Sequence, residues 1–423
     1  MIEQIYQGQK FWHTPTIFWF DASDIMLGFV CYAGMAAAFL VLLNIFTRPA
    51  LISCYCLNLS LVEIGQDFTH FQWDVLLLEV GFLAIFLTWG SGIIVLVYRW
   101  LLARFMFMGG LLKVASGDPS WANWSALNFH YETQPLPTPV AYYAHQLPGW
   151  IHKASVGGMF FIELIVPFFV FLPRPFRIFA CCAFILLQSG IILTGNYNFF
   201  NLLVLMLCLF LLEDRDIKKI LSPRLIVYIQ QHKALPGSVA HTFAGLWGGL
   251  IIIICLSQVW LYQAHKPLYK PLKSILRTTS IFSLVNNYGP FAVMTTQRKE
   301  IIVQGSTDGQ YWLDYEFKYK PGNLNRDLSW IIPHQPRLDW QMWFAALGPP
   351  RKDSWFDGLL KQLLLGSPQV LSLLLENPFA DNPPKYVRAV LYRYTFTTLE
   401  QKRSNNQVWQ RQYEGVYWPV SRL

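Results

Sequence analysis

The chain has 423 residues, of which 54% are hydrophobic and only 14% are charged, and its mean hydropathy is +0.32. Soluble domains carry about 25% charged residues, so lipid must cover much of this chain. The composition excludes a soluble enzyme, a disordered chain and a disulfide scaffold. The formal net charge of +8 fits the Lys and Arg excess in cytoplasmic loops of membrane proteins, so we do not expect nucleic-acid binding.

Apolar segments fill most of the first 262 residues. Ile25–Phe46 contains no charged residue and has about the 20 residues that a helix needs to cross a membrane. Seven further segments bring the prediction to about eight spans, three of which are short: Leu51–Ile64, Val75–Tyr98, Trp100–Leu112, Ser155–Leu172, Ile178–Thr194, Phe199–Leu212 and Val239–Tyr262. The sequence therefore predicts a multi-pass α-helical membrane domain over residues 1–273.

Loop charge predicts the orientation of these spans. The connection Glu213–Ser238 is rich in Lys and Arg, and two more Arg lie two spans earlier, which indicates that both loops are cytoplasmic. The loop Lys113–Lys153 and the region beyond Tyr262 then face the lumen or periplasm. The basic residues of the two loops predicted to be cytoplasmic are Arg174, Arg177, Arg215, Lys218, Lys219, Arg224 and Lys233. Lys266, Lys270, Lys273 and Arg277 argue against an outward-facing region beyond Tyr262.

From about Ser274 the composition becomes that of a soluble domain. Short runs of β-branched and aromatic residues predict strands, Tyr386–Thr398 alternates strongly, and Asp308-Gly309 is typical of a hairpin turn. A helix is predicted over Trp355–Leu375, broken at Pro368. The predicted strands are Phe291–Gln297, Glu300–Gly305, Tyr311–Tyr319 and Tyr386–Thr398. We therefore expect a soluble, β-rich, sandwich-like domain over residues 274–423.

Seven cysteines lie in apolar segments, where a thiol is usually an inert, small hydrophobic group. The pairs Cys54-x-Cys56 and Cys181-Cys182 do not have redox-motif spacing. The outward-facing domain has no cysteine. We therefore do not expect the protein to act through its own thiols.

Acidic residues are concentrated around one pair of predicted spans. Leu61–Phe86 contains Glu63, Asp67, Asp74 and Glu79. A charge at the bilayer centre costs about 2.5–3.5 kcal/mol on insertion scales, so Glu79 needs a partner or water. It could handle protons or bind a ligand, but a packing hydrogen bond to a neighbouring Arg, His or backbone group is favoured. The same two interpretations apply to Glu163, beside Pro167.

The loop Lys113–Lys153 is rich in polar residues, including Asp118, His130, Glu132, His145 and His152. His130-x-Glu132 could form an acid–base pair or bind a metal. Its spacing matches no metal template, and on a strand the two side chains would simply point the same way, so we predict neither a metal nor a cofactor. A rigid interfacial loop with hydrogen-bonded histidines is favoured. The candidate functional polar cluster is Asp74, Glu79, Asp118, His130 and Glu132.

Two further segments carry unusual residues. The three asparagines of GNYNFFN (residues 195–201) can satisfy backbone groups at a tight turn. The segment Pro333–Leu347 combines basic, acidic and aromatic residues, so Arg337 and Asp339 could pair, and the tryptophans could be core residues or anchors for a client protein. Core packing is the default. The candidate client-binding residues are His334, Arg337, Asp339, Trp340 and Trp343.

Four long sequence segments of the chain resemble the lipase maturation factor family. They are GQDFTHFQWDVLLLEVGFLAIF (Gly65–Phe86), SGDPSWANWSALNFHYETQPLPTP (Ser116–Pro139), GNYNFFNLL (Gly195–Leu203) and EFKYKPGNLNRDLSWIIPHQPRLDWQMWFAAL (Glu316–Leu347). The resemblance covers about Phe18 to Thr398. It implies a multi-pass protein of the endoplasmic reticulum membrane that helps secreted dimeric lipases to fold and assemble, with a lumenal C-terminal portion that engages clients.

The resemblance thus implies a chaperone-like factor, not an enzyme, with secreted lipases or other hydrolases and the lipid bilayer as partners. In a bacterium it would lie in the inner membrane. Family members usually begin with an additional span and a loop, whereas the match here starts almost at Met1, so we expect either an N-terminus on the outer side or a shortened sequence. Compact loops also suit a bacterial relative.

Two alternatives from other classes remain open. One is a membrane-embedded enzyme acting on a lipid-soluble or secreted substrate, similar in architecture to the vitamin K-dependent carboxylases, with Glu79, Glu163, His130 and Glu132 near the bilayer surface. Against it, the sequence contains no Walker loop, GxGxxG, GxSxG or zinc pattern. The other is a transporter, which is weaker because neither half-repeats nor paired broken helices are visible.

Overall fold

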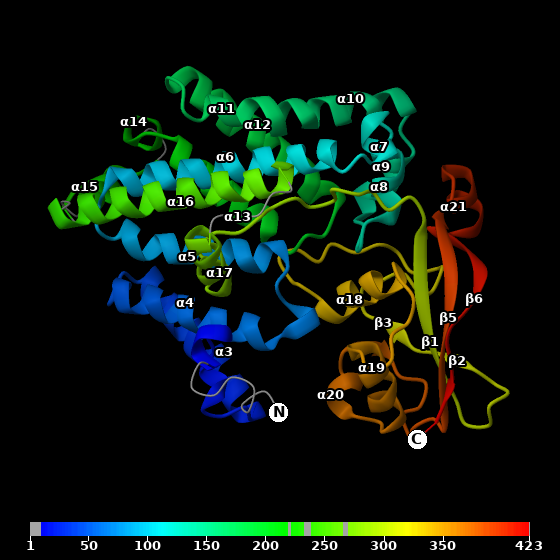
Figure 1. The fold of residues 1–423 in the computed structure, drawn as a ribbon. Helices are drawn as coiled ribbons and strands as arrows, with labels where there is room; N and C mark the ends of the chain where they lie inside the picture. The colour runs from blue at the N-terminus through cyan, green and yellow to red at the C-terminus, as the bar shows by residue number, and fades with distance from the viewer. Residues whose placement is uncertain (1–9, 219–220, 232–237, 265–269, 423) are drawn as a thin grey trace. The chain divides into compact units, whose positions relative to one another are not determined.

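The computed structural model describes residues 10–218, 221–231, 238–264 and 270–422, which form two compact units (Figure 1). The first unit contains Met1–Leu112, Ile162–Ile185 and Leu203–Pro290, and the second contains Lys113–Phe161, Leu186–Leu202 and Phe291–Leu423. Each unit therefore combines segments that are distant in sequence. Lys219, Lys233 and Lys266 of the orientation argument lie outside the described residues.

Helices build the first unit. Local capping fixes some of their ends: the Ser23 hydroxyl accepts a hydrogen bond from the Met26 N–H at 3.2 Å where α3 begins. The helices that lie wholly in this unit are α2 (Lys10–His13), η1 (Ile17–Trp19), α3 (Asp24–Leu42), α4 (Thr47–Ile64), η2 (Gln66–Phe68), α5 (Gln72–Leu87), α11 (Val166–Phe169), η4 (Leu209–Leu211), α14 (Asp214–Ile217), α15 (Pro223–Gln231), α16 (Ser238–Ala264) and α17 (Lys270–Ile281).

Four further helices of the described chain contain residues of both units. They are α6 (Gly92–Ala115), the π-helical turn η3 (Phe161–Ile165), α12 (Arg174–Thr194) and α13 (Phe200–Cys208). Four helical stretches of the described chain are long and apolar enough to cross a membrane: Asp24–Leu42, Gly92–Ala115, Gly149–Phe169 and Arg174–Thr194. The predicted apolar segments are thus mostly helical, but only these four meet both criteria.

One predicted helix boundary was wrong. The sequence prediction ran one span from Val75 to Tyr98 and began the next at Trp100, whereas α5 ends at Leu87 and α6 begins at Gly92. Gly90 adopts a left-handed conformation with φ of 71°, which glycine accepts without steric cost. The Ser91 hydroxyl then accepts a hydrogen bond from the Ile93 N–H at 3.3 Å. The chain therefore breaks at this turn, and Arg99 lies inside a helix.

The loop predicted at Lys113–Lys153 is largely helical and belongs to the second unit. Its helices are α7 (Pro119–Ala122), α8 (Leu127–Thr133), α9 (Pro139–His145) and the start of α10 (Gly149–Phe160). Thr138 caps α9 by accepting a hydrogen bond from the Ala141 N–H at 3.3 Å. His130 and Glu132 are therefore on a helix, not on a strand as assumed, and their side chains leave α8 in different directions.

An antiparallel sheet with strand order β2-β1-β5-β6 is the centre of the second unit. Its strands are β1 (Arg298–Ser306), β2 (Leu313–Asp314), β5 (Tyr386–Phe396) and β6 (Trp409–Ser421), while β3 (Glu316–Phe317) pairs with β4 (Leu374–Glu376). The helices α18 (Arg337–Ala346) and α19 (Trp355–Leu364) pack against β1 and β5. Two short helices, α20 (Pro368–Leu371) and α21 (Leu399–Asn405), complete the unit.

This arrangement confirms a membrane part followed by a β-rich part, and it refines the details. Helices, rather than a second large sheet, form the layer that faces the four-stranded sheet. Phe291–Gln297 is not a strand, because side chains of the 113–161 segment bind its backbone: Trp121 Nε1 donates to the Phe291 carbonyl at 3.0 Å, and Asp118 accepts from the Met294 N–H at 2.8 Å.

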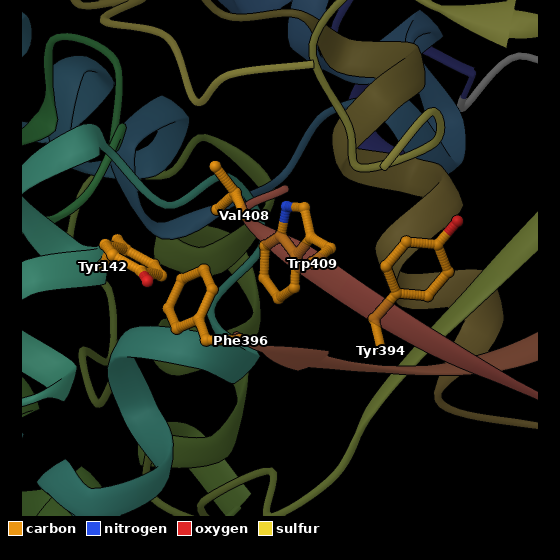
Figure 2. Packing of buried hydrophobic residues seen from close by; sticks show 5 residues of the cluster. All are labelled: Tyr142, Tyr394, Phe396, Val408 and Trp409. Atoms are coloured by element: carbon orange, nitrogen blue, oxygen red, sulfur yellow. The ribbon is translucent and has the colours of Figure 1, made fainter. Parts of the chain in front are cut away.

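Aromatic side chains from two segments of the second unit, residues 113–161 and 291–423, share one core (Figure 2). Its buried members are Tyr142, Tyr394, Phe396, Val408 and Trp409. The Phe396 and Trp409 rings stack with centroids 4.2 Å apart. Tyr142 comes from α9, and its hydroxyl donates to the Thr398 carbonyl at 3.0 Å. The 113–161 segment is therefore built into the β-rich unit.

Candidate functional site

The predicted client-binding residues divide between the core and the surface of the second unit. Asp339, Trp340 and Trp343 of α18 are buried, whereas His334 is exposed and Arg337 is partly exposed. Trp343 Nε1 donates a hydrogen bond to the Thr133 carbonyl at 2.8 Å. The two tryptophans therefore have the core role given as the default. Of the five residues, only His334 and Arg337 have side chains that reach the surface.

Asp339 holds a backbone turn. Its Oδ1 accepts hydrogen bonds from the N–H groups of Tyr319 and Lys320, both at 2.8 Å. Burial raises the pKa of the Asp339 carboxyl, although these hydrogen bonds and the charge of Lys320 oppose the shift. Asp339 therefore binds the backbone of residues 319 and 320.

The candidate polar cluster is not one site. Asp74 and Glu79 belong to the first unit, and Asp118, His130 and Glu132 to the second. Asp118 accepts from the Ser120 N–H at 2.7 Å and thereby caps α7. His130 Nε2 lies 3.2 Å from the Tyr197 hydroxyl, while Glu132 Oε2 accepts from the Phe396 N–H at 2.6 Å. His130 and Glu132 thus bind separate partners and form no acid–base pair.

Burial controls the ionisation of both groups. Desolvation and the nearby Lys113 lower the pKa of His130 to about 4. Desolvation raises the pKa of Glu132, against the opposing effects of its hydrogen bond and of Arg298. His130 is therefore neutral near pH 7. In the described part of the chain no three His, Cys, Asp or Glu side chains gather into a metal-binding group.

Glu79 of the first unit has the hydrogen-bonded surroundings given as the favoured interpretation. It forms a buried ion pair with Arg104 of α6. Its second oxygen accepts from the Tyr288 hydroxyl at 2.7 Å, and from the Asn286 N–H at 3.1 Å and side chain at 3.2 Å. Glu79 thus ties α5 to α6 and to the segment after α17.

Asp74 and Glu163 are also buried in the first unit. Asp74 accepts a hydrogen bond from the Phe71 N–H at 3.2 Å and so caps the start of α5. Glu163 lies in the π-helical turn η3, and its carboxylate group is 3.9 Å from where a Cβ on Gly109 would stand. An alanine at position 109 would therefore be in ordinary van der Waals contact with the carboxylate.

The asparagine-rich turn has the predicted structural role. Asn196 donates to the carbonyls of Leu136 at 3.1 Å and Ser329 at 2.9 Å, and accepts from the Ile331 N–H at 2.8 Å. Asn198 donates to the Gln335 side chain at 2.6 Å. This turn thereby joins three distant segments of the second unit.

Sequence reasoning missed a buried charge cluster in the second unit. Arg298, Glu300 and Lys320 are each at most 2% exposed. Glu300 lies 2.6 Å from Arg298 and 2.9 Å from Lys320. Arg298 also donates to the carbonyls of Glu132 at 2.9 Å and Pro135 at 2.8 Å. The sequence signal was the run of three charged residues directly before the apolar residues of β1.

Sequence reasoning also missed a shallow groove of about 400 Å³ on the same unit. Its floor comes from β1, β5 and β6, and one wall comes from the chain after α18. Tyr417 fixes that wall, because its hydroxyl donates to the Ala345 carbonyl at 2.9 Å. The lining residues are Lys299, Ala346, Leu347, Gly348, Pro349, Pro350, Leu391, Val416 and Tyr417. The groove can accept a small apolar group beside a positive charge.

An apolar helical part with candidate spans, followed by a β-rich part, defines a two-part membrane protein. The family described as "Lipase maturation factor transmembrane domain" matches residues 2–219, and the one described as "Lipase maturation factor C-terminal domain" matches residues 284–419. The chain therefore belongs to the lipase maturation factor family. This confirms the resemblance that the sequence words indicated.

Named relatives match over nearly the whole chain. Lipase maturation factor 2 of Xenopus tropicalis is 32% identical over an alignment 547 positions long, which covers 98% of this chain and 76% of the relative. The human lipase maturation factor 2 is 32% identical, covering 97% and 75%. Lipase maturation factor 1 of Mus musculus is 34% identical over 459 residues, covering 100% and 80%. No solved structure matches the chain.

Proposed function

We propose that this protein is a membrane-anchored maturation factor that assists the folding or assembly of secreted proteins, in particular lipases or related hydrolases. The observation that carries the proposal is the match of both family domains, in order, over nearly the full chain. The relatives are named as lipase maturation factors. A noncatalytic role is further supported by the buried polar residues, which hold helices and strands together.

The proposal includes an orientation, with the second unit in the lumen of the endoplasmic reticulum or, in a bacterium, in the periplasm. Its support is the cationic side of the first unit. Arg177 donates to the Leu211 carbonyl at 2.8 Å and pairs with Glu213, while Arg174 pairs with Asp216. The two basic loops are therefore neighbours on one side of this unit, as expected if both are cytoplasmic.

The test is lipase maturation in cells that lack their own maturation factor. The full chain is co-expressed with a secreted dimeric lipase, and the activity per mass of secreted lipase is compared with that from an empty vector. We expect the specific activity to rise, with the client recovered on the full chain after crosslinking. A chain that is inserted and folded, yet changes neither lipase activity nor lipase secretion, would contradict the proposal.

The orientation has its own measurement. A protease added to sealed microsomes should spare the second unit and should cleave it once the membrane is permeabilised. Cleavage of the second unit in sealed vesicles would place it on the cytosolic side and would refute the orientation.

A further inference from the structure

The strand β6 lies at the edge of the four-stranded sheet (Figure 1). In the described chain it pairs only with β5. Three of its side chains are well exposed: Tyr413 at 56%, Val416 at 58% and Val420 at 54%. An open edge has unpaired N–H and C=O groups, to which another extended chain can add as a strand. Pro419 has no N–H, so the run that can pair ends near Trp418.

The groove and the open edge adjoin each other. Val416 and Tyr417 belong to β6 and also line the groove, whose opposite wall is Leu347–Pro350. A strand added to β6 would therefore pass the mouth of the groove. Backbone pairing would supply affinity, and the groove would select a side chain.

The rim of this surface carries excess positive charge. The side chains of Lys299 and Arg393 are each 41% exposed. Both form ion pairs with Glu414, Lys299 at 3.6 Å and Arg393 at 2.7 Å. Arg351 and Lys352 are exposed beyond Pro350 and are followed by Asp353. Arg351 also acts electrostatically on the Tyr417 hydroxyl. The two acids leave an excess of two positive charges.

We propose that an extended segment of an incompletely folded client, with apolar side chains next to acidic ones, pairs with β6 and inserts an apolar side chain into the groove. This inference rests on the proposed maturation function and names its client surface. The charge excess favours an acidic segment. It disfavours a second copy of this chain, because pairing two β6 edges would bring like-charged rims together.

The first test measures peptide binding to the detergent-solubilised full chain. Two fluorescent peptides share one apolar sequence, flanked by Asp in one and by Lys in the other, and binding is followed by anisotropy. We expect the Asp peptide to bind about tenfold more tightly, a difference of about 1.4 kcal/mol. The preference should shrink at high salt, which screens exposed charges. Equal binding, or tighter binding of the Lys peptide, would overturn the proposal.

Variants locate the surface. Val416→Asn removes an exposed apolar group from the groove and should weaken binding of the Asp peptide. Leu365→Asn is the matched control, because Leu365 is 57% exposed and does not line the groove; it should bind as the parent does. The double change Lys299→Glu with Arg351→Glu should reverse the preference toward the Lys peptide. Unchanged binding in Val416→Asn, or no reversal in the double variant, would overturn the assignment.

Three further outcomes separate this inference from a second copy of the chain and from the proposed function. A doubled particle mass that Val416→Asn returns to the single mass would assign the edge to a second copy and overturn the client assignment. If peptide binding fails while lipase maturation proceeds, the groove assignment is wrong and the proposed function stands. If the peptides bind as expected while lipase maturation fails, the acidic-segment surface is supported and lipases are wrong as its clients.

Discussion

Arg298 and Glu300 form a buried ion pair within a single strand, with Arg298 Nη2 2.6 Å from Glu300 Oε1 and neither side chain more than 1% exposed. Lys320 supplies the second positive charge at 2.9 Å from the other carboxylate oxygen. Arg298 also donates hydrogen bonds to backbone carbonyls within residues 132–135. Its guanidinium lies over the Trp409 ring, 5.1 Å from the ring centroid. This pair therefore joins the 113–161 segment to the sheet.

Replacing Glu300 with Gln should strongly destabilise the second unit. The change leaves Arg298 and Lys320 as buried charges without a counter-charge, and breaking a buried pair in this way costs about 3–5 kcal/mol. The measurement is the thermal midpoint of the purified full chain, together with the temperature at which the second unit becomes sensitive to protease.

The matched control is Lys361→Ala. Lys361 and Asp357 pair at 2.9 Å with the lysine side chain 59% exposed, and an exposed helix pair contributes little. Its midpoint should equal that of the parent. A Glu300→Gln protein as stable as this control would show that the buried cluster is dispensable.

Trp409→Ala should remove the centre of the aromatic core in Figure 2. The indole is 1% exposed, stacks on Phe396 and lies under Arg298, so its removal leaves a cavity. Large-to-small changes of this kind cost about 3–5 kcal/mol. Unfolding midpoints should show the loss, whereas Trp330→Ala should be silent because Trp330 is 51% exposed. Equal losses in both variants would mean that the core packing described here is incorrect.

The sequence predicted those features that depend on local composition. Apolar runs located the helices, because lipid-exposed helices must be apolar along their length. A short run of β-branched residues located β1, and alternation located β5. The break between α5 and α6 was misplaced at residue 99, whose charged side chain donates to the Phe210 carbonyl at 2.7 Å within the first unit. Such a contact between distant residues leaves no local signal.

Tertiary contacts explain the other errors. The Phe291–Gln297 segment has strand-forming residues, but Trp121 and Asp118 bind its backbone from 170 or more residues away. The candidate site was predicted from residue type, so Trp340 and Trp343 were grouped with exposed His334 although they are buried. The groove could not be predicted, because its lining comes from three strands and a turn that only the fold brings together.

The second unit should lose stability as the pH falls from neutral toward 4. The pKa of His130 is about 4 in the folded chain against 6.5 for a free histidine, so protonation below pH 6.5 favours the unfolded chain. The contribution of neutral His130 to the free energy of unfolding is therefore complete above pH 6.5 and is lost as the pH falls to about 4. The loss from His130 at pH 5 is about 2 kcal/mol.

His130→Gln isolates this contribution from other titrating groups. The pKa of His145 is also lowered by burial and acts in the same direction. The raised pKa of Glu132 acts in the opposite direction, because a proton on Glu132 favours the folded chain. Thermal midpoints at pH 7 and pH 5 should differ less in His130→Gln than in the parent. Identical pH dependence in both proteins would rule out His130 as the titrating group.

Glu79→Gln separates a structural role for the membrane carboxylate from a catalytic one. The change leaves Arg104 buried without its counter-charge, so we expect a loss of about 3–5 kcal/mol and less folded protein on heated fluorescence-detected size exclusion. Lipase activation per folded molecule should not change, because Glu79 acts by joining α5, α6 and residues 286–288. Adding Arg104→Met should restore part of the stability, since both charges are then gone. A Glu79→Gln protein that folds normally yet activates no lipase would instead favour the membrane-enzyme alternative and would make the group around Glu79 its first candidate site.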